Sequence, residues 1–365
     1  MGRRERIVVA MSGGVDSAVA AARCVAAGDE VIGISLRLAR DGGGSCCSLD
    51  DFHDARAVAD HLGFPHYVFD LADDFERHVI HPFVAEYLAG RTPNPCARCN
   101  RQLKFGVLWA RARALGARWL ATGHYARIGT DPVTGRPCLR TAVDAGKDQT
   151  YFLFALDQDD LAHVRFPVGE LTKAEVRAEA AALGLRVADK PESMEVCFVP
   201  DGDAAGFVER HAPSGALRPG RVVDEAGRQV GRHAGVHRFT VGQRRGLELA
   251  GGHRARRYVK ALDAHTATVT VSDAAGLRAR GLVAHGTSWA GGAAPAPDSR
   301  LAVRIRHRHP LIPARVLATD PGATTVLFDD DGPAVTPGQA AVFYRGDTVL
   351  GGGWIAAALG ERAVP

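Results

Sequence analysis

The sequence has no long apolar run. Across its 365 residues, no uninterrupted apolar stretch approaches the roughly 20 residues that a membrane-spanning helix needs. The run Ile7–Ala10 near the start is also too short for the apolar core of a signal peptide. We therefore expect a cytoplasmic protein that does not bind a membrane.

Cysteine is scarce, and its number is odd. The chain has seven cysteines, spread over most of its length: Cys24, Cys46, Cys47, Cys96, Cys99, Cys138 and Cys197. This set does not suit a disulfide framework, which pairs its cysteines and is found mainly in small secreted domains. Reduced thiols with a catalytic or metal-binding role fit better, and they agree with a reducing compartment.

An excess of one charge is also lacking. The net charge of +4 at pH 7 does not by itself indicate a nucleic-acid-binding protein. Two stretches, residues 242–260 and 300–315, are nevertheless basic with almost no acidic residues among them. Taken alone, each fits a solvated basic surface as well as a phosphate-binding one.

The length and the pattern of apolar residues predict an α/β protein with several domains. A chain of 365 residues is long for one hydrophobic core. Up to about residue 200, apolar runs alternate with segments of helical period, which is typical of βαβ units around a parallel sheet. After about residue 212, glycine becomes frequent and the apolar runs shorten, as in antiparallel β structure. We expect domains at residues 1–211, 212–278 and 279–365.

The individual elements follow from the same patterns. Strands are expected at Ile7–Ala10, Val31–Leu38, Tyr67–Asp70 and Trp119–Ala121. Helices are expected at Ser17–Ala27, Leu49–Leu62, Asp74–Leu88, Leu103–Leu115 and Lys173–Leu183. Thr172 is the expected N-cap of the last helix, with Glu175 three residues further on. Turns are expected at Glu225-Ala226-Gly227 and at Asp331-Gly332.

A glycine loop lies between the first expected strand and the first expected helix. Gly13 and Gly14 permit a turn that other residues forbid, and they let main-chain N–H groups approach an anion. The loop is neither a Walker A sequence nor a dinucleotide fingerprint. We predict that it holds a phosphate at the helix N-terminus with the hydroxyls of Ser12 and Ser17, while Asp16 serves Mg²⁺. The alternative is a plain turn between strand and helix.

Two segments carry cysteines of interest. Cys96-x-x-Cys99 follows two prolines and precedes the helix expected from Leu103. A thiol just before a helix N-terminus, amid basic residues, is biased toward the reactive thiolate. A metal-ligand pair and an inert cysteine are the alternatives, since one C-x-x-C is half of the usual ligand set. Cys197, taken alone, is typical of a buried core cysteine.

These motifs resemble two known groups of proteins. The sequence SGGVDS, Ser12–Ser17, resembles the loop of ATP-pyrophosphatase (PP-loop) enzymes, which transfer AMP to an oxygen and release pyrophosphate. With CARCN, ATGHYAR, KDQTYFLF, FPVGELTKAEVR, KPESMEVCFV, FTVGQRRGL and VTPGQAAVFY…GGGWI, it resembles the bacterial tRNA-specific 2-thiouridylases over nearly the whole chain. The resemblance implies a parallel-sheet ATP-pyrophosphatase domain followed by two small β domains, the last a β-barrel.

The resemblance also implies a reaction. The family thiolates the wobble uridine of tRNA: ATP with Mg²⁺ adenylates the C2 oxygen, and sulfur from a cysteine persulfide replaces it. Cys197 would carry the persulfide, Cys99 would be its nucleophilic partner, and a Cys99–Cys197 disulfide would remain. Their Cα atoms must then come within about 4.4–6.8 Å at some stage. The implied partners are tRNA and a sulfur donor, either a cysteine desulfurase or a relay protein, and we expect a monomer.

Binding residues are implied by position in the family's motifs. The ATP contacts would be Ala10, Met11, Ser12, Gly13, Gly14, Val15, Asp16, Ser17, Leu36 and Gly123. The tRNA contacts would be His124, Lys147, Asp148, Gln149, Arg306, His307 and Gln339. Leu36 stands where the family often has methionine, so it would offer only apolar or main-chain contact. His307 stands where relatives can have tyrosine.

Cys96 departs from the family, because some relatives have aspartate there. A thiol does not replace a carboxylate at neutral pH unless its pKa is lowered. Either the acid is dispensable, or Cys96 belongs to a variant site such as an iron–sulfur cluster with Cys99, Cys197 and the pair Cys46-Cys47. The cluster is the less favoured alternative.

Other functions remain as alternatives. An amide ligase of the ATP-pyrophosphatase group would need no paired thiols, and the sequence shows no glutaminase segment. A non-catalytic RNA-binding or iron–sulfur scaffold protein would keep the glycine loop only as a relic. Cys24 and Cys138 are expected to be structural.

Overall fold

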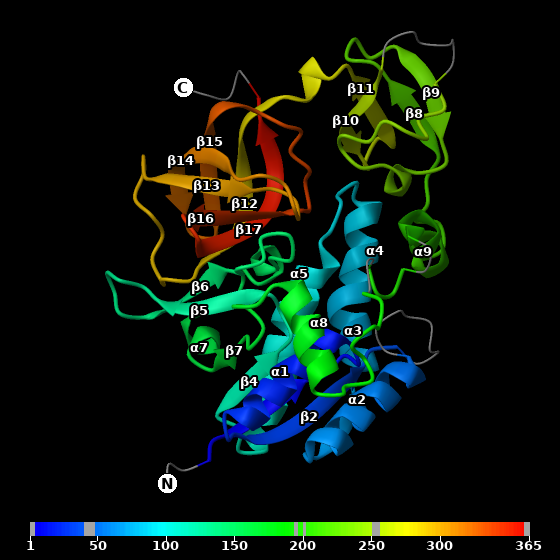
Figure 1. The fold of residues 1–365 in the computed structure, drawn as a ribbon. Coiled ribbons are helices and arrows are strands. Elements are labelled where there is room, and N and C mark those ends of the chain that lie inside the picture. Colours follow the sequence, from blue (N-terminus) through cyan, green and yellow to red (C-terminus); the bar gives the residue numbers. More distant parts are fainter. Residues whose placement is uncertain (1–3, 40–47, 193–195, 200–201, 250–255, 361–365) are drawn as a thin grey trace.

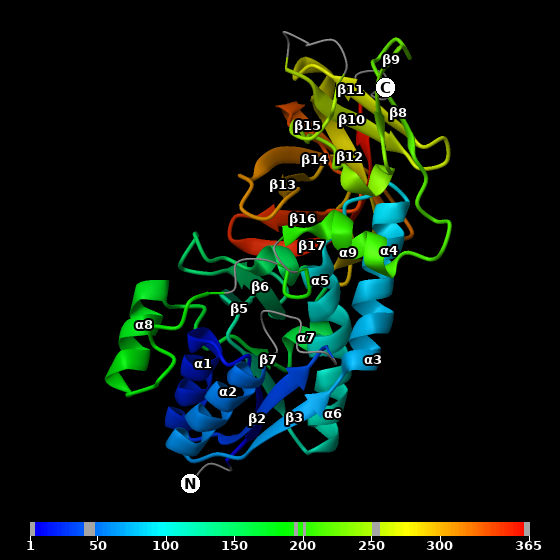
Figure 2. The ribbon, with the colours of Figure 1, turned by 90° about the vertical axis from the view of Figure 1, so that its right-hand side faces the viewer.

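A computed structural model describes residues 4–39, 48–192, 196–199, 202–249 and 256–360. It consists of a parallel sheet flanked by helices, a small four-stranded sheet, and a β-barrel (Figures 1 and 2). The expected α/β class with two further β domains is confirmed. Among the described segments, none of the helices combines the length and the apolar character that spanning a bilayer requires.

The parallel sheet has the strand order β3-β2-β1-β4-β7. Its strands are β1 (Arg6–Ala10), β2 (Glu30–Arg37), β3 (His66–Asp70), β4 (Trp119–Thr122) and β7 (Val164–Arg165). The three central residues of β1 are wholly buried, because helices cover both faces of a parallel sheet. The first four strands lie within one residue of their predicted bounds. Strand β7 was not predicted, because a strand of two residues is too short to show an alternating pattern of apolar residues.

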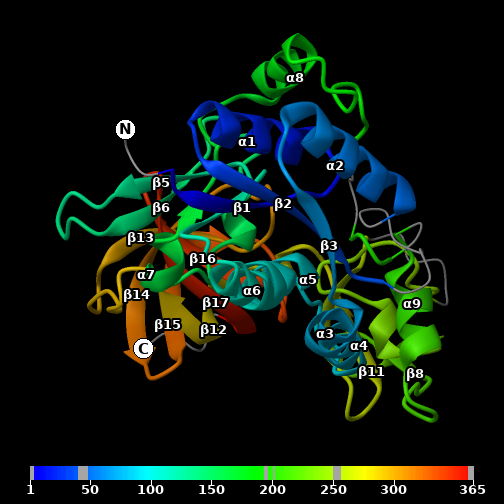
Figure 3. The same ribbon diagram turned by 90° about the horizontal axis from the view of Figure 1, so that it is seen from below.

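Helices lie on both faces of this sheet (Figure 3). On one face are α1 (Val15–Ala26), α2 (Leu49–Leu62) and α8 (Lys173–Ala182), which share a core cluster with β1. On the other face, α6 (Trp109–Ala114) packs on the opposite side of the same strand. The predicted capping box of α8 is present. The side chain of Thr172 accepts a hydrogen bond from the main-chain amide of Glu175, and the side chain of Glu175 accepts one from the main-chain amide of Thr172. Helix α2 has its predicted bounds.

Two long helical stretches each contain a π-helical segment. The first runs through α3 (Ala72–Phe75), η1 (Glu76–Ile80) and α4 (His81–Leu88), and the second through α5 (Pro95–Cys99), η2 (Asn100–Leu108) and α6. The prediction that a helix begins at Leu103 was wrong. It begins at Pro95, because Asn94 caps it through the Ala97 amide at 3.2 Å and proline suits the first helical position. Cys96 and Cys99 therefore lie inside the helix, not before it.

The rest of the chain is mainly antiparallel. After α7 (Gln158–Leu161), α8 and α9 (Ala204–His211) come β8 (Gly220–Val223), β9 (Gln229–His233), β10 (Tyr258–Asp263) and β11 (Thr268–Ser272), which form one sheet. The barrel has β12 (Ala279–Trp289), β13 (Arg300–Arg304), β14 (Ile312–Asp320), β15 (Ala323–Gly332), β16 (Ala340–Arg345) and β17 (Thr348–Leu359). Pairing of β12 with β17 closes it.

A hairpin from the first half of the chain joins the barrel. Strands β5 (Ala126–Thr130) and β6 (Pro137–Thr141) extend the barrel sheet, where Arg140 pairs with Thr348 of β17. The turn predicted at Asp331-Gly332 is instead the end of β15. The turn at residues 225–227 lies between β8 and β9, as predicted. The segment that follows β4 of the parallel sheet therefore contributes two strands to the barrel sheet.

Candidate functional site

A cavity of about 850 Å³ lies where β1, β2 and β4 end. The carboxyl ends of parallel strands are the usual place for a ligand in α/β proteins. The loop after β1, helix α5, the segment around Cys197, and His307 and Gln339 of the barrel part all contribute to its wall. Residues from distant regions of the sequence thus meet around one space.

Most of the predicted site residues line this cavity. From the ATP set, Ala10, Met11, Ser12, Gly14, Val15, Asp16, Ser17, Leu36 and Gly123 do so. From the other sets, Cys96, Cys99, Cys197, His124, Lys147, Gln149, His307 and Gln339 do so. Gly13, Asp148 and Arg306 are not part of the lining. Cys46 and Cys47 lie outside the described residues.

The loop after β1 is a compact turn that requires glycine at position 13. Gly13 has φ +73°, and a Cβ there would lie 2.3 Å from the main-chain oxygen of Asp51. The Ser17 hydroxyl donates to the oxygen of Gly14 at 3.0 Å and accepts from the amide of Ser12 at 3.2 Å. Gly14 is the N-cap of α1 and brings no side chain to its first amides. This geometry leaves helix N–H groups for an anion.

Gly123 fixes the distance between the loop and the end of β4. A Cβ at this position would lie 2.6 Å from the amide nitrogen of Ser17 and 2.7 Å from the carbonyl carbon of Asp16. Both contacts are with backbone, which cannot rotate away as a flexible side chain can. Only glycine fits here without moving the loop.

Lysine is concentrated at the cavity. The chain has five lysines among its 45 basic residues, and four of them line this space: Lys104, Lys147, Lys173 and Lys190. Lysine offers a compact charge with three rotatable donors, whereas arginine presents a rigid planar fork. In a chain that otherwise uses arginine almost throughout, this distribution indicates a site for a polyanion.

Two of the lysines bind Glu192 in the segment before Cys197, and one of them, Lys173, also binds the loop. Nζ of Lys173 lies 2.7 Å from Oδ1 of Asp16 and 2.8 Å from Oε1 of Glu192. Nζ of Lys147 lies 2.5 Å from Oε2 of Glu192. Burial alone would raise the pKa of Glu192, but hydrogen bonds to the two lysines outweigh it and lower that pKa to about 2. Glu192 therefore stays ionised and joins both cations.

A third lysine holds the loop from its other side. Nζ of Lys190 donates to the oxygen of Gly13 at 3.0 Å and lies 2.7 Å from both Asp51 and Asp54. Burial lowers the pKa of Lys190, but the two carboxylates more than compensate and raise it overall. The loop conformation is thus fixed by a permanently charged group from a segment almost 180 residues away.

The two histidines of the site favour the neutral form. His124 is buried, and burial together with the charge of Lys104 places its pKa well below the usual 6.5. Its Nδ1 lies 2.6 Å from the Thr122 hydroxyl. His307 is half-buried, and desolvation and neighbouring arginines lower its pKa. Its ring lies 4.6 Å from that of Phe152, centroid to centroid. An aromatic contact is therefore made at the position where relatives can have tyrosine.

Asp148 and Arg306 are engaged outside the cavity. The Asp148 carboxylate is buried, lies 2.7 Å from Arg304 and accepts from the Thr150 hydroxyl at 2.9 Å. Arg306 donates to the oxygen of Ala334 at 3.1 Å and to the hydroxyl of Thr336 at 3.0 Å. The predicted tRNA set thus divides into residues that face the cavity and two that hold structure behind it.

Cys99 and Cys197 pack against the same cluster of buried apolar side chains, which contains Phe83 and Phe198. Cys24 and Cys138 are buried elsewhere, and burial raises the pKa of Cys24 to about 12, which makes it an unreactive thiol. Within the described part of the chain, no three His, Cys, Asp or Glu side chains gather as metal ligands would.

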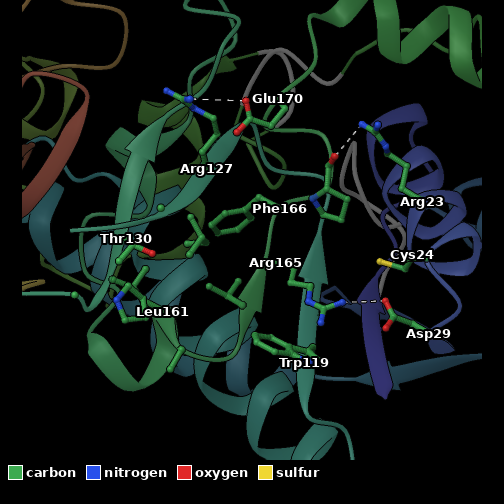
Figure 4. A pocket seen from close by; sticks show the side chains of 18 residues that line it. Arg23, Cys24, Asp29, Trp119, Arg127, Thr130, Leu161, Arg165, Phe166 and Glu170 are labelled. Atoms are coloured by element: carbon green, nitrogen blue, oxygen red, sulfur yellow. Dashed lines mark hydrogen bonds and ion pairs between the residues drawn. The ribbon is translucent and has the colours of Figure 1, made fainter. Parts of the chain in front are cut away.

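A second cavity, of about 570 Å³, lies beside β4 and β7 (Figure 4). Its arginines already have partners: Arg165 lies 3.0 Å from Asp29, Arg127 lies 3.7 Å from Glu170, and Arg23 donates to a main-chain oxygen (Figure 4). None of the residues predicted to bind ATP or tRNA lines it. The candidate functional site is therefore the first cavity.

Several residues of the site were not predicted. Lys173, Lys190, Glu192 and Tyr125 all lie within the quoted motifs, but no role was assigned to them. The Tyr125 hydroxyl donates to Oδ1 of Asp16 at 2.7 Å, and burial and that carboxylate raise the pKa of Tyr125. Because the sequence has only five lysines, their positions would have pointed to two of these residues, Lys173 and Lys190.

Three family models match consecutive parts of the chain. One described as tRNA methyl transferase HUP domain matches residues 5–201. A tRNA methyl transferase PRC-barrel domain matches residues 205–273, and an aminomethyltransferase beta-barrel domain matches residues 279–355.

Curated relatives match over nearly the full length. The tRNA-specific 2-thiouridylase MnmA of Geotalea uraniireducens (strain Rf4) is 49% identical, covering 99% of this chain and 97% of that protein. The protein of the same name from Geobacter metallireducens (strain ATCC 53774 / DSM 7210 / GS-15) is 50% identical, covering 98% of each. Among solved structures, a 4-thiouridine synthetase–RNA complex with bound ATP is 14% identical with a TM-score of 0.35, covering 57% of this chain and 50% of that chain.

Proposed function

Since the chain belongs to the tRNA-specific 2-thiouridylase family and is therefore a tRNA-uridine 2-sulfurtransferase, we propose that its main cavity adenylates and then thiolates the wobble uridine. One observation carries the proposal: the glycine loop, Cys99 and Cys197 border a single cavity of about 850 Å³. An activation step and a sulfur transfer at the same atom require that arrangement.

The first half-reaction uses the loop after β1. The amides at the start of α1 and the ammonium groups of Lys173 and Lys190 would hold the phosphates of ATP, and Asp16 would share its carboxylate with Mg²⁺. The uridine C2 oxygen attacks the α-phosphorus, and pyrophosphate leaves. The oxygen thereby becomes part of a good leaving group, AMP.

The second half-reaction uses the two thiols. The terminal sulfur of a persulfide on Cys197 attacks C2 and expels AMP. Cys99 then attacks the Sγ of Cys197, which releases 2-thiouridine and leaves a Cys99–Cys197 disulfide that an external thiol must reduce. The sulfur donor of this proposal is a cytoplasmic cysteine desulfurase or a relay protein.

Five of the proposed tRNA contacts line the cavity. The described cavity-lining residues of that set are His124, Lys147, Gln149, His307 and Gln339. The wobble base must leave the stacked anticodon loop to reach them, as in other enzymes that modify a base. We propose that Asp148, which is buried, holds the turn between Lys147 and Gln149 through its pair with Arg304.

The test is a reaction with purified components. The protein is incubated anaerobically with unmodified tRNA, Mg-ATP, a thiol reductant, and cysteine with a cysteine desulfurase, which supplies sulfur at the persulfide level. Nucleosides are analysed by mass spectrometry while pyrophosphate is assayed. The proposal expects one sulfur per wobble uridine together with pyrophosphate release that depends on tRNA. Pyrophosphate release without any gain of sulfur would overturn the thiol part and point to an amide ligase.

A further inference from the structure

Gln339 faces the backbone that precedes Cys99. Its Nε2 donates to the oxygen of Thr92 at 3.0 Å and to that of Pro93 at 3.2 Å. We propose that Gln339 is a positioning residue, which sets the place of segment 92–99 and hence of Cys99. The inference rests on the proposed role of Cys99 as a nucleophile, and it gives Gln339 a task besides contact with tRNA.

The backbone beside Gln339 is docked on the same segment. The amide of Thr92 donates to the oxygen of Pro337 at 2.9 Å. Gly338 has φ +91°, and a Cβ there would lie 2.8 Å from the oxygen and 2.9 Å from the nitrogen of Thr92. The barrel part and the catalytic segment therefore meet backbone to backbone, without a side chain between them that could adapt.

Chemistry fixes the orientation of the Gln339 amide. Its Oε1 lies 3.4 Å from the hydroxyl of Tyr151, which also donates to the oxygen of Ala340 at 3.0 Å. The amide NH₂ thus faces two carbonyl oxygens, and the amide oxygen faces a hydroxyl. Tyr151 is fully buried, so this contact set is shielded from water.

A displacement of Thr92 would be passed on to Cys99. Pro93 and Pro95 have fixed φ angles, so the backbone between Thr92 and the start of α5 has few ways to absorb a shift. Asn94 caps α5 at 3.2 Å, and Cys99 is the last residue of that five-residue helix. The backbone between the Gln339 contact at Thr92 and Cys99 is therefore short and conformationally restricted.

The other β domain and the barrel each add a contact to this region. The hydroxyl of Thr92 donates to that of Thr240, at 3.0 Å. The guanidinium of Arg98, next to Cys99, lies 5.5 Å from the centre of the Trp354 ring in β17. All three parts of the protein thus meet at the segment that carries Cys99, which ties its position to the docking of the barrel.

The test compares two glutamine variants of the full-length protein. Gln339→Met keeps the length of the side chain but removes both donors. We expect kcat for thiolation to fall between about 10-fold and about 100-fold, because small misplacements of a reacting group have that effect. We expect KM for tRNA to change by less than kcat. In the protein without tRNA, the rate at which iodoacetamide alkylates Cys99, followed by peptide mass spectrometry, should change by about threefold or more.

Gln158→Met is the matched control. Nε2 of Gln158 also donates to two carbonyl oxygens, those of Pro137 at 2.8 Å and Ala290 at 2.5 Å. It therefore bridges β6 and the barrel part with the same chemistry, but its two acceptors lie outside segment 92–99. This variant should lose as much thermal stability as Gln339→Met while keeping kcat and the alkylation rate of Cys99.

The outcomes separate the possible roles. A rise in KM for tRNA with unchanged alkylation of Cys99 would make Gln339 a tRNA contact only and would overturn the inference. Equal losses of kcat in both variants would show a general effect of barrel docking, which also overturns it. Changed alkylation with unchanged thiolation would instead refute the proposed role of Cys99, while the positional coupling would stand.

Discussion

Lys173 and Asp16 form the central ion pair of the site, with Nζ 2.7 Å from Oδ1. Only 12% of the lysine side chain is exposed, so water screens this pair less than a surface pair. Tyr125 donates to the same carboxylate oxygen, and Glu192 binds the other side of the ammonium group. The positive charge is thus held beside the anion-binding loop before any ligand arrives.

Replacement of Lys173 by methionine should slow activation. The variant Lys173→Met removes the charge that would stabilise the departing pyrophosphate, so we expect tRNA-dependent pyrophosphate release to fall about 100-fold or more. Arg6→Met is the control, since Arg6 makes a 2.6 Å pair with Glu30 at the opposite end of β1. A Lys173→Met rate within about twofold of wild type would remove Lys173 from the activation step.

Substitution of Gly123 should impair nucleotide binding. In Gly123→Ala, the new Cβ would meet the backbone of Asp16 and Ser17 at 2.7 and 2.6 Å, so the loop must move. We expect ATP affinity of the tRNA-free protein to fall about tenfold or more, measured by titration calorimetry. Gly291→Ala is the control, because no atom lies within 4 Å of a Cβ at that position. Unchanged affinity in Gly123→Ala would contradict the placement of ATP.

Glu192 should make stability depend on pH in a defined direction. Its folded-state pKa of about 2 lies below the usual 4.5, so its stabilising effect is complete above about pH 4.5 and is lost as the pH falls toward 2. Glu192→Gln should therefore lower the unfolding free energy at pH 7 by roughly 1 to 3 kcal/mol, and by progressively less toward pH 2. Thermal unfolding at several pH values measures this difference.

Glu225→Gln provides the comparison for Glu192. Glu225 also pairs with a lysine, Lys260, at 2.6 Å, but 47% of its side chain is exposed. Water screens such a pair, so its loss should change stability little at any pH. A Glu192→Gln difference that is equally large at pH 7 and pH 2 would mean that the loss does not come from the ionised carboxylate.

The sequence predicted elements whose pattern is local. Leu49–Leu62 is a helix with its predicted bounds, because its apolar period and its cap both lie within the segment. The attachment of the β5–β6 hairpin to the barrel sheet could not be predicted, because β17, the partner of β6, lies about 200 residues further along the chain. The helix start at Pro95 was missed because the two prolines suggested an extended approach, although Asn94 is a good N-cap.

Only the parts of the site that lie within sequence motifs could be predicted. The glycine loop and the reactive thiol of the C-x-x-C segment could be proposed from the residues themselves, whereas Cys197 was singled out only by the resemblance to the family. The structure brings the loop, Cys99 and Cys197 to one cavity. The link from Asp16 through Lys173 to Glu192 joins three separate segments, so no spacing in the sequence shows it. The same holds for Gln339, whose side chain meets carbonyl groups almost 250 residues earlier.

The two half-reactions should be separable by substitution. Cys197→Ser should abolish formation of 2-thiouridine in the presence of a persulfide donor, because a hydroxyl cannot carry the persulfide. It should leave tRNA-dependent pyrophosphate release close to wild type, since that step uses the loop after β1. Asp16→Ala should abolish both. The measurement is a single reaction in which pyrophosphate and thiolated nucleoside are followed together.

Two further cysteine variants show whether the effect is specific. Cys24→Ala should leave both activities unchanged, because this thiol is buried in α1 and its pKa is raised to about 12. Cys96→Ser should keep most of the thiolation, since the proposed sulfur transfer uses only Cys99 and Cys197. Loss of thiolation in Cys96→Ser together with iron in the purified wild-type protein would favour a cluster over the persulfide route. Full thiolation in Cys197→Ser would instead place the persulfide on another cysteine.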